Sequence, residues 1–237
     1  MVKAVDEKCH VKLNTRIISV DLESDEGKVV AVTENGETII AKNAVVACGA
    51  WTNSVLDSLK LPKLNLKVWQ VQWAHYEVDS AVADSIPQAF HFRKESNIDG
   101  GLYYVFPANA TESLNNGGKT FVKVGVDFPT GNDLEGMDTF NYEGSDEVVW
   151  LMDEWVKEHL PEVGGRIDSY CHPYTMTDDS YFVMDKVAPN VAIFSGGSGR
   201  AFKFGPLLGD CMSSLLNGDE APIDLVPFSM KREGVLA

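Results

Sequence analysis

The stretch GGSGRAFKFGPLLGD, residues 196–210, combines three glycines, a lysine between two phenylalanines and the start of a helix-like run. The run before it, NVAIFS, is mostly apolar and predicts a strand buried on both faces. Apolar residues then recur at helical spacing up to Asn217-Gly218, which predicts the helix end. Glycines allow a close backbone approach, and a helix start offers free N–H groups. The stretch therefore predicts a strand–glycine–helix turn that can meet a flat or anionic ligand. The spacing alone favours the alternative of a tight turn without a ligand, because the sequence contains neither GxGxxG nor GxxxxGK(S/T).

A second unit of this kind is expected at residues 44–60. The apolar run AVVAC predicts a buried strand, Gly49-Ala50-Trp51 follows it, and a helix pattern comes next, with Thr52 or Asn53 as N-cap. In an open sheet, ligands bind beyond the carboxyl ends of such strands. The sequence therefore indicates ligand binding beyond the carboxyl ends of these strands.

The rest of the chain predicts mainly antiparallel structure. Short β-rich runs predict a meander within residues 11–48, where Asn35-Gly36 is a hairpin signal. A helix is expected at 145–160, since apolar residues share one face and Pro161 follows. No helix pattern separates the next group of expected strands, which favours an antiparallel sheet: 66–78, 88–93, 101–106 and 120–127. Strands are also expected at 166–177 and 181–184.

Composition narrows the class of protein. The 237 residues are 44% hydrophobic and carry a net charge of −15, which is typical of a soluble globular protein and excludes nucleic acid as an expected partner. We expect no membrane segment and no signal peptide. The four cysteines are widely spaced, which argues against a zinc site or a disulfide scaffold, so a cytoplasmic location and no metal are expected.

The glycine stretch resembles the flavin-contacting segment of the sarcosine oxidase-like flavoproteins. These belong to the D-amino-acid-oxidase (glycine oxidase) superfamily of FAD-dependent amine oxidases. Four further segments are similar to segments of that family and follow in the same order: NAVVACGAWTNSVL, GLYYVFP with FVKVGVD, YTMTDDSYFVMD and PIDLVPFSMKR. The resemblance covers the chain from residue 11 and implies FAD as cofactor.

The resemblance also assigns roles to three catalytic candidates. Lys203 stands where the family has a lysine that pairs with the substrate carboxylate, and Tyr104 matches a tyrosine that lines the pocket. Lys123 stands where the family keeps a lysine near the flavin that assists oxygen reduction. From the residues alone, Lys123 could equally face outward and Tyr104 could be a core aromatic. Asp127 replaces a histidine of several members, so sarcosine itself is not assigned as the substrate.

Other residues are implied as cofactor contacts. Cys171 is the candidate for a thioether to the flavin, although one extra residue before Tyr174 could turn its thiol to the other face of the strand. His172 is a weaker alternative. Arg200 replaces the family's usual histidine. The resemblance places the remaining contacts in the two glycine turns: Gly49, Ala50, Trp51, Gly197, Ser198, Gly199 and Ala201.

The expected fold class is α+β, related to α/β. Residues 1–62 and 178–237 would form a partial FAD-binding domain with the meander, and 63–177 an antiparallel-sheet substrate domain. The family begins with a strand–GxGxxG–helix unit, which this sequence does not contain. We therefore expect that a second chain supplies it, or that the chain is a C-terminal fragment.

The leading interpretation is an oxidase that converts an amino-acid-type secondary or primary amine to an imine and forms hydrogen peroxide. Its partners would be a small amine that carries a carboxylate and molecular oxygen. One alternative is a catalytically incomplete fragment or remnant that binds a carboxylate ligand or a partner chain. Another is a flavin dehydrogenase that uses a different electron acceptor and would not need Lys123.

Overall fold

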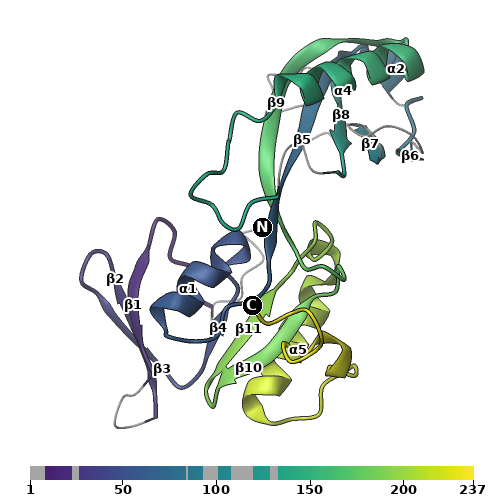
Figure 1. Ribbon diagram of the computed structural model, residues 1–237. Helices are drawn as coiled ribbons and strands as arrows, with labels where there is room; N and C mark the ends of the chain where they lie inside the picture. Colours follow the sequence, from purple (N-terminus) through teal and green to yellow (C-terminus); the bar gives the residue numbers. More distant parts are fainter. Residues whose placement is uncertain (1–8, 23–26, 84, 93–100, 108–119, 129–132) are drawn as a thin grey trace. The chain divides into compact units, whose positions relative to one another are not determined.

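The computed structural model describes residues 9–22, 27–83, 85–92, 101–107, 120–128 and 133–237. Within them the chain divides into two units (Figure 1). Unit 1 is formed from the described residues of 1–65, 179–196 and 200–237, and unit 2 from those of 66–178 and 197–199. The α+β class expected from the sequence is confirmed. None of the helices in the described ranges is long and apolar enough to cross a membrane.

Unit 1 contains two three-stranded sheets. The first is the expected meander, with the antiparallel order β1-β2-β3: Ile17–Asp21, Val29–Thr33 and Thr38–Ala41. The second has the order β10-β11-β4, and in it β4 lies parallel to β11 while β10 is antiparallel: Val183–Ala188, Val191–Ser195 and Ala44–Val46. The β4–β11 pair thus joins residues 44–46 to residues 191–193, which lie far apart in the sequence.

Both strands of the β4–β11 pair lead into a short 3-10 turn and then a helix, as the two strand–glycine–helix patterns predict. After β4 come η2 (Gly49–Trp51) and α1 (Thr52–Ser58). After β11 come η3 (Phe202–Phe204) and α5 (Gly205–Asn217), and α5 ends at Gly218 with a φ of 78°. The apolar side of α5 packs on the second sheet through Leu208, Cys211 and Met212. The remaining turn, η4 (Val226–Phe228), lies near the end of the chain.

The N-cap expected for α1 is wrong. Neither Thr52 nor Asn53 caps it, because Thr52 is already the first helical residue and Trp51 is the N-cap. The Asn53 side chain instead exchanges two hydrogen bonds with the backbone of Leu64. Asn53 thus ties the helix to the segment that follows it.

Unit 2 is a five-stranded antiparallel sheet with one helix, α4 (Asp146–His159), packed on one face (Figure 1). The apolar side of α4 packs into the core with alternate residues of the central strands, through Val148, Val149, Met152, Trp155 and Val156. The short helix α2 (Ser80–Ala83) follows β5. In sheet order the strands are β6 (Ala89–Phe92), β7 (Leu102–Pro107), β8 (Phe121–Val126), β5 (Lys67–Val78) and β9 (Val163–Met176).

Candidate active site

In unit 1 the candidate site begins where β4 and β11 end. Ala44 pairs with Val191 and Val46 with Ile193, so the two parallel strands end side by side. Each then reaches a glycine in the left-handed region: Gly49 has a φ of 53° and Gly196 a φ of 66°. A side chain would be strained at both positions. Bare backbone therefore occupies the sheet edge at which ligands bind in such folds.

Two buried hydroxyls join these turns. The Oγ of Ser195 donates a hydrogen bond of 3.1 Å to the Oγ1 of Thr52. The Oγ1 of Thr52 in turn donates to the carbonyl oxygen of Gly49 at 2.7 Å. Ser195 is 2% exposed and Thr52 is fully buried. This chain of hydrogen bonds fixes the glycine turn after β4 against the end of β11.

The second turn of unit 1 carries Arg200, Ala201 and Lys203. Lys203 lies in η3, immediately before α5, and its side chain is exposed, with Nζ 5.8 Å from the centre of the Phe204 ring. The first turn of α5 contains no acidic residue and no side chain caps it. An ammonium beside a free helix N-terminus favours an anion such as a carboxylate.

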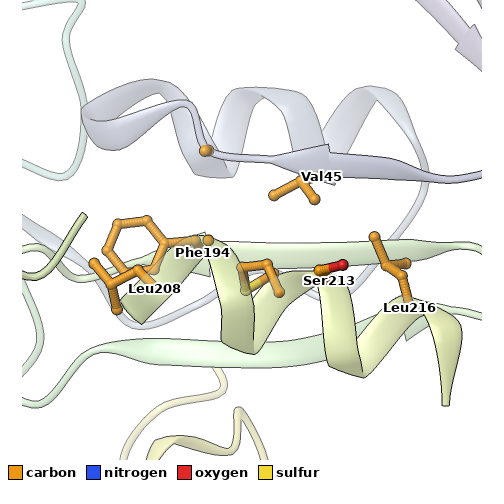
Figure 2. A pocket seen from close by; sticks show the side chains of 8 residues that line it. Val45, Phe194, Leu208, Ser213 and Leu216 are labelled. Atoms are coloured by element: carbon orange, nitrogen blue, oxygen red, sulfur yellow. The ribbon is translucent and has the colours of Figure 1, made fainter. Parts of the chain in front are cut away.

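A cavity of about 370 Å³ is lined by residues of β4, β11 and α5 and by Ala47 (Figure 2). Val45 lies on one side of it, and Phe194, Leu208 and Leu216 lie on the other. Ser213 supplies the only hydroxyl among its lining residues. The cavity suits an apolar group and not the carboxylate of a substrate.

In unit 2 the candidate site lies on the open face, which we define as the sheet face opposite α4. Residues that alternate with the core positions lie on it. His75 pairs with Lys123 across β5 and β8, and Trp73 pairs with Tyr170 across β5 and β9. The side chains of this face are mostly aromatic: Trp73, His75, Phe90, Tyr104, Phe106, Tyr170, His172 and Tyr174.

Lys123 is a cation of this aromatic face. Its Nζ lies 4.1 Å from the centre of the Trp73 ring, a distance typical of a cation–π contact. The side chain is half-buried. Burial, and then the nearby Lys123 ammonium, lower the pKa of His172. The open face therefore combines a lysine ammonium with a histidine that favours its neutral form.

Tyr104 lies next to Lys123's strand. Its ring covers Gly125, the residue with which it pairs on β8. Burial raises the pKa of the Tyr104 hydroxyl, with smaller contributions from Tyr174 and Asp127. The phenol therefore stays protonated at neutral pH and can donate a hydrogen bond.

The glycine loop 197–199 belongs to unit 2 because it contacts the end of β9. The backbone N–H of Ser198 donates to the carbonyl oxygen of Thr175 at 2.9 Å. Gly199 has a φ of 68°, and a Cβ there would lie 2.2 Å from the Tyr174 ring. Both features hold the loop against the open face.

The Cys171 thiol lies on the other face of the sheet. Cys171 pairs with Gln72, whose side chain hydrogen-bonds the backbone of Ser145 before α4. Burial raises the pKa of the thiol to about 11. A thioether through Cys171 stays a prediction, and this position argues against it, whereas His172 lies on the open face with Lys123.

Sequence reasoning missed four residues of the candidate sites in the two units. Trp73 and Tyr174 contact Lys123 and Gly199, and Thr52 and Ser195 join the glycine turns. The sequence carried a signal for the first two: Trp73 lies in the aromatic-rich strand expected at 66–78, and Tyr174 begins the family-like segment YTMTDDSYFVMD. Nothing in the sequence marks the hydroxyl pair, since it depends on the pairing of β4 with β11. Among the described residues, no group of three or more His, Cys, Asp or Glu side chains could hold a metal ion.

Comparison with known proteins identifies the family to which this chain belongs. The family model for FAD-dependent oxidoreductases, DAO, matches residues 1–215. The chain belongs to this FAD-dependent oxidoreductase family. It is 29% identical to N-methyl-L-tryptophan oxidases of Yersinia pestis and Yersinia pseudotuberculosis over 98% of its length. It spans 58% of the length of those relatives.

Solved structures of amino acid oxidases share the fold. NikD, described as an unusual amino acid oxidase essential for nikkomycin biosynthesis, superposes with a TM-score of 0.73 at 22% identity, over 91% of this chain and 54% of NikD. Glycine oxidase from Geobacillus kaustophilus superposes with a TM-score of 0.69 at 19% identity, over 92% of this chain and 52% of that enzyme. The family's α+β architecture is therefore present in both units.

The residues present fit a flavin. Gly49 and Gly196 leave bare backbone at the ends of two parallel strands, where a flat ring can approach. On the open face, Lys123 supplies a positive charge and Tyr104 a hydrogen-bond donor. A ring that gains negative charge when reduced is stabilised by a fixed cation.

Proposed function

We propose that this protein uses FAD to oxidise an amino-acid-type secondary or primary amine to an imine, with formation of hydrogen peroxide. The observation that supports it most is the Lys123 ammonium on the aromatic open face, in a chain of the FAD-dependent oxidoreductase family. FAD would supply the redox chemistry, as acceptor of a hydride from the carbon beside the amine and as donor of electrons to oxygen.

Lys203 binds the substrate carboxylate in this proposal. Its ammonium is exposed and lies directly before the uncapped start of α5, and both favour an anion. A carboxylate held there orients the neighbouring C–N bond. The substrate is then an amino acid or a related amine that carries a carboxylate, as the name of the N-methyl-L-tryptophan oxidases indicates for those relatives.

In this proposal Tyr104 lines the substrate pocket and Lys123 assists the reduction of oxygen. Tyr104 remains a neutral phenol because burial raises its pKa, so it lines the pocket and donates a hydrogen bond without becoming an anion. Lys123 provides a fixed positive charge that stabilises the anions formed when oxygen is reduced.

A visible absorbance spectrum before and after addition of FAD tests the cofactor. The proposal predicts flavin bands that remain after gel filtration, and bleaching when N-methyl-L-tryptophan or another N-methyl amino acid is added without oxygen. Readmitted oxygen should restore the bands and yield one peroxide per imine. A protein that binds FAD but is bleached by none of a panel of primary and secondary amino acids would contradict the proposed reaction.

A further inference from the structure

The contact between Lys123 and Trp73 joins neighbouring strands of unit 2. Trp73 lies on β5 and pairs with Gly125 of β8, two residues beyond Lys123. Across the two strands, the Nζ of Lys123 lies 4.1 Å from the centre of the indole ring. The position of the ammonium therefore depends on that of the indole.

The indole is itself held by aromatic neighbours on β9. The rings of Trp73 and Tyr170 stack at 4.4 Å with an interplanar angle of 26°. The ring of His172 lies 5.7 Å away at 29°. Aromatic pairs at such distances stabilise a fixed arrangement beyond their buried area. Trp73 is thus a rigid support and not a mobile surface ring.

An indole has the strongest attraction for a cation among the aromatic side chains, and it holds the cation without cancelling its charge. Neighbouring side chains of this face also contact one another. His75, across from Lys123, has its Nδ1 2.8 Å from the Oδ1 of Asp168. The Oδ2 of Asp168 accepts a hydrogen bond from Tyr170. His172, whose pKa is lowered, favours its neutral form.

We propose that Trp73 is a positioning residue for Lys123: its ring holds the ammonium on the open face in the place where oxygen is reduced. This inference rests on the proposed function, because it deepens the role given there to Lys123. It adds that Trp73 acts on the oxygen step through Lys123, and not on amine oxidation. The rings of Tyr170 and His172, which stack on Trp73, support this positioning by holding the indole in place.

The first test measures reoxidation in a stopped-flow instrument, after anaerobic reduction of the FAD-loaded protein. We expect Trp73→Leu to lower the second-order rate constant for oxygen about tenfold, while anaerobic reduction by the amine keeps its rate. Trp73→Phe retains a ring and should recover most of the rate. Trp150→Leu is the matched control, since Trp150 is 59% exposed on α4.

A double-mutant cycle separates this inference from the proposed function. If Trp73 acts through Lys123, Trp73→Leu should have no further effect on reoxidation in a Lys123→Met background. Equal effects of Trp73→Leu with and without Lys123 would overturn the inference alone. A Lys123→Met variant that reoxidises at the normal rate would overturn both.

A second readout needs no flavin. Reductive methylation with formaldehyde and cyanoborohydride, followed by peptide mass spectrometry, measures how accessible each lysine is. Trp73→Leu should speed modification of Lys123 severalfold, leave exposed lysines such as Lys157 unchanged, and be reversed by Trp73→Phe. Near-UV circular dichroism would confirm that the variants are folded. Unchanged modification of Lys123 in folded Trp73→Leu would contradict the positioning role.

Discussion

The ring of Tyr104 covers Gly125 so closely that a Cβ at position 125 would lie 2.3 Å from the Tyr104 Cζ atom. Gly125 therefore admits the ring that lines the proposed pocket. We expect Gly125→Ala to displace Tyr104, to destabilise the protein by about 1–3 kcal/mol and to weaken substrate binding. Chemical unfolding and the KM for the amine measure both effects.

Gly165→Ala is the matched control for this prediction. Gly165 lies on β9 of the same sheet, and a Cβ there would meet no atom within 4 Å. Its substitution should change the free energy of unfolding by no more than about 0.5 kcal/mol. Equal effects of the two alanines would show that the Tyr104 contact is unimportant.

The hydroxyl pair of Ser195 and Thr52 gives a second prediction. Thr52→Val removes the acceptor of Ser195 and the donor to Gly49 in a buried place. Leaving such groups unsatisfied costs about 1–3 kcal/mol. The double variant with Ser195→Ala should lose less stability than the sum of the two single variants, as urea unfolding would show.

Ser58→Ala is the control for the hydroxyl pair, because the exposed Ser58 of the same helix bonds only the backbone of Val55. It should change stability by no more than about 0.5 kcal/mol. If the Thr52 and Ser195 variants proved strictly additive, the hydrogen bond between them would contribute nothing to the fold.

Burial of Cys171 predicts a dependence of stability on pH. The pKa of its thiol rises from 9.0 to about 11 on folding, so the folded state retains the proton longer than the unfolded state. The contribution of the raised pKa to the free energy of unfolding is fully present below pH 9 and is lost as the pH rises toward 11. The full loss, above both pKa values, is about 2–3 kcal/mol. Unfolding free energies between pH 8 and 10.5 should fall more steeply for the native protein than for Cys171→Ala. Parallel curves would contradict the burial of the thiol.

Lys203 should affect the binding of the substrate carboxylate and not the oxidation of the amine. Lys203→Met is expected to raise the KM for a carboxylate-bearing amine about ten- to a hundredfold, since a charge-assisted hydrogen bond is lost. The corresponding amine without its carboxylate should be oxidised equally by both proteins. Lys231→Met, at an exposed lysine of the same unit, serves as the control. A similar loss for both substrates would assign Lys203 a structural role.

Much of the fold follows from local patterns. The two strand–glycine–helix units were predictable because buried apolar runs, glycines and helical spacing all lie close together in sequence. The helix α4 and the strands of unit 2 were predictable for the same reason. Tyr104 and Lys123 lie on one face because alternation and strand pairing place them there.

Features that depend on pairing between distant strands were not predictable. The extra residue before Tyr174 signalled that Cys171 could face away from Lys123, but no local signal sets its pairing with Gln72. The expected cap of α1 failed because Asn53 bonds the backbone of Leu64, outside the helix. Trp73 contacts Lys123 only because β5 and β8 are neighbours in the sheet.

The most direct test of the proposed oxidase follows the reaction of the reduced, FAD-loaded protein with oxygen, in native and Lys123→Met forms. The proposal predicts that Lys123→Met lowers the reoxidation rate by about 10²–10³, while anaerobic reduction by the amine stays within about twofold. Peroxide should form in step with reoxidation. Reoxidation of Lys123→Met at the native rate would contradict the proposed role of Lys123 and would favour a dehydrogenase that passes its electrons to another acceptor.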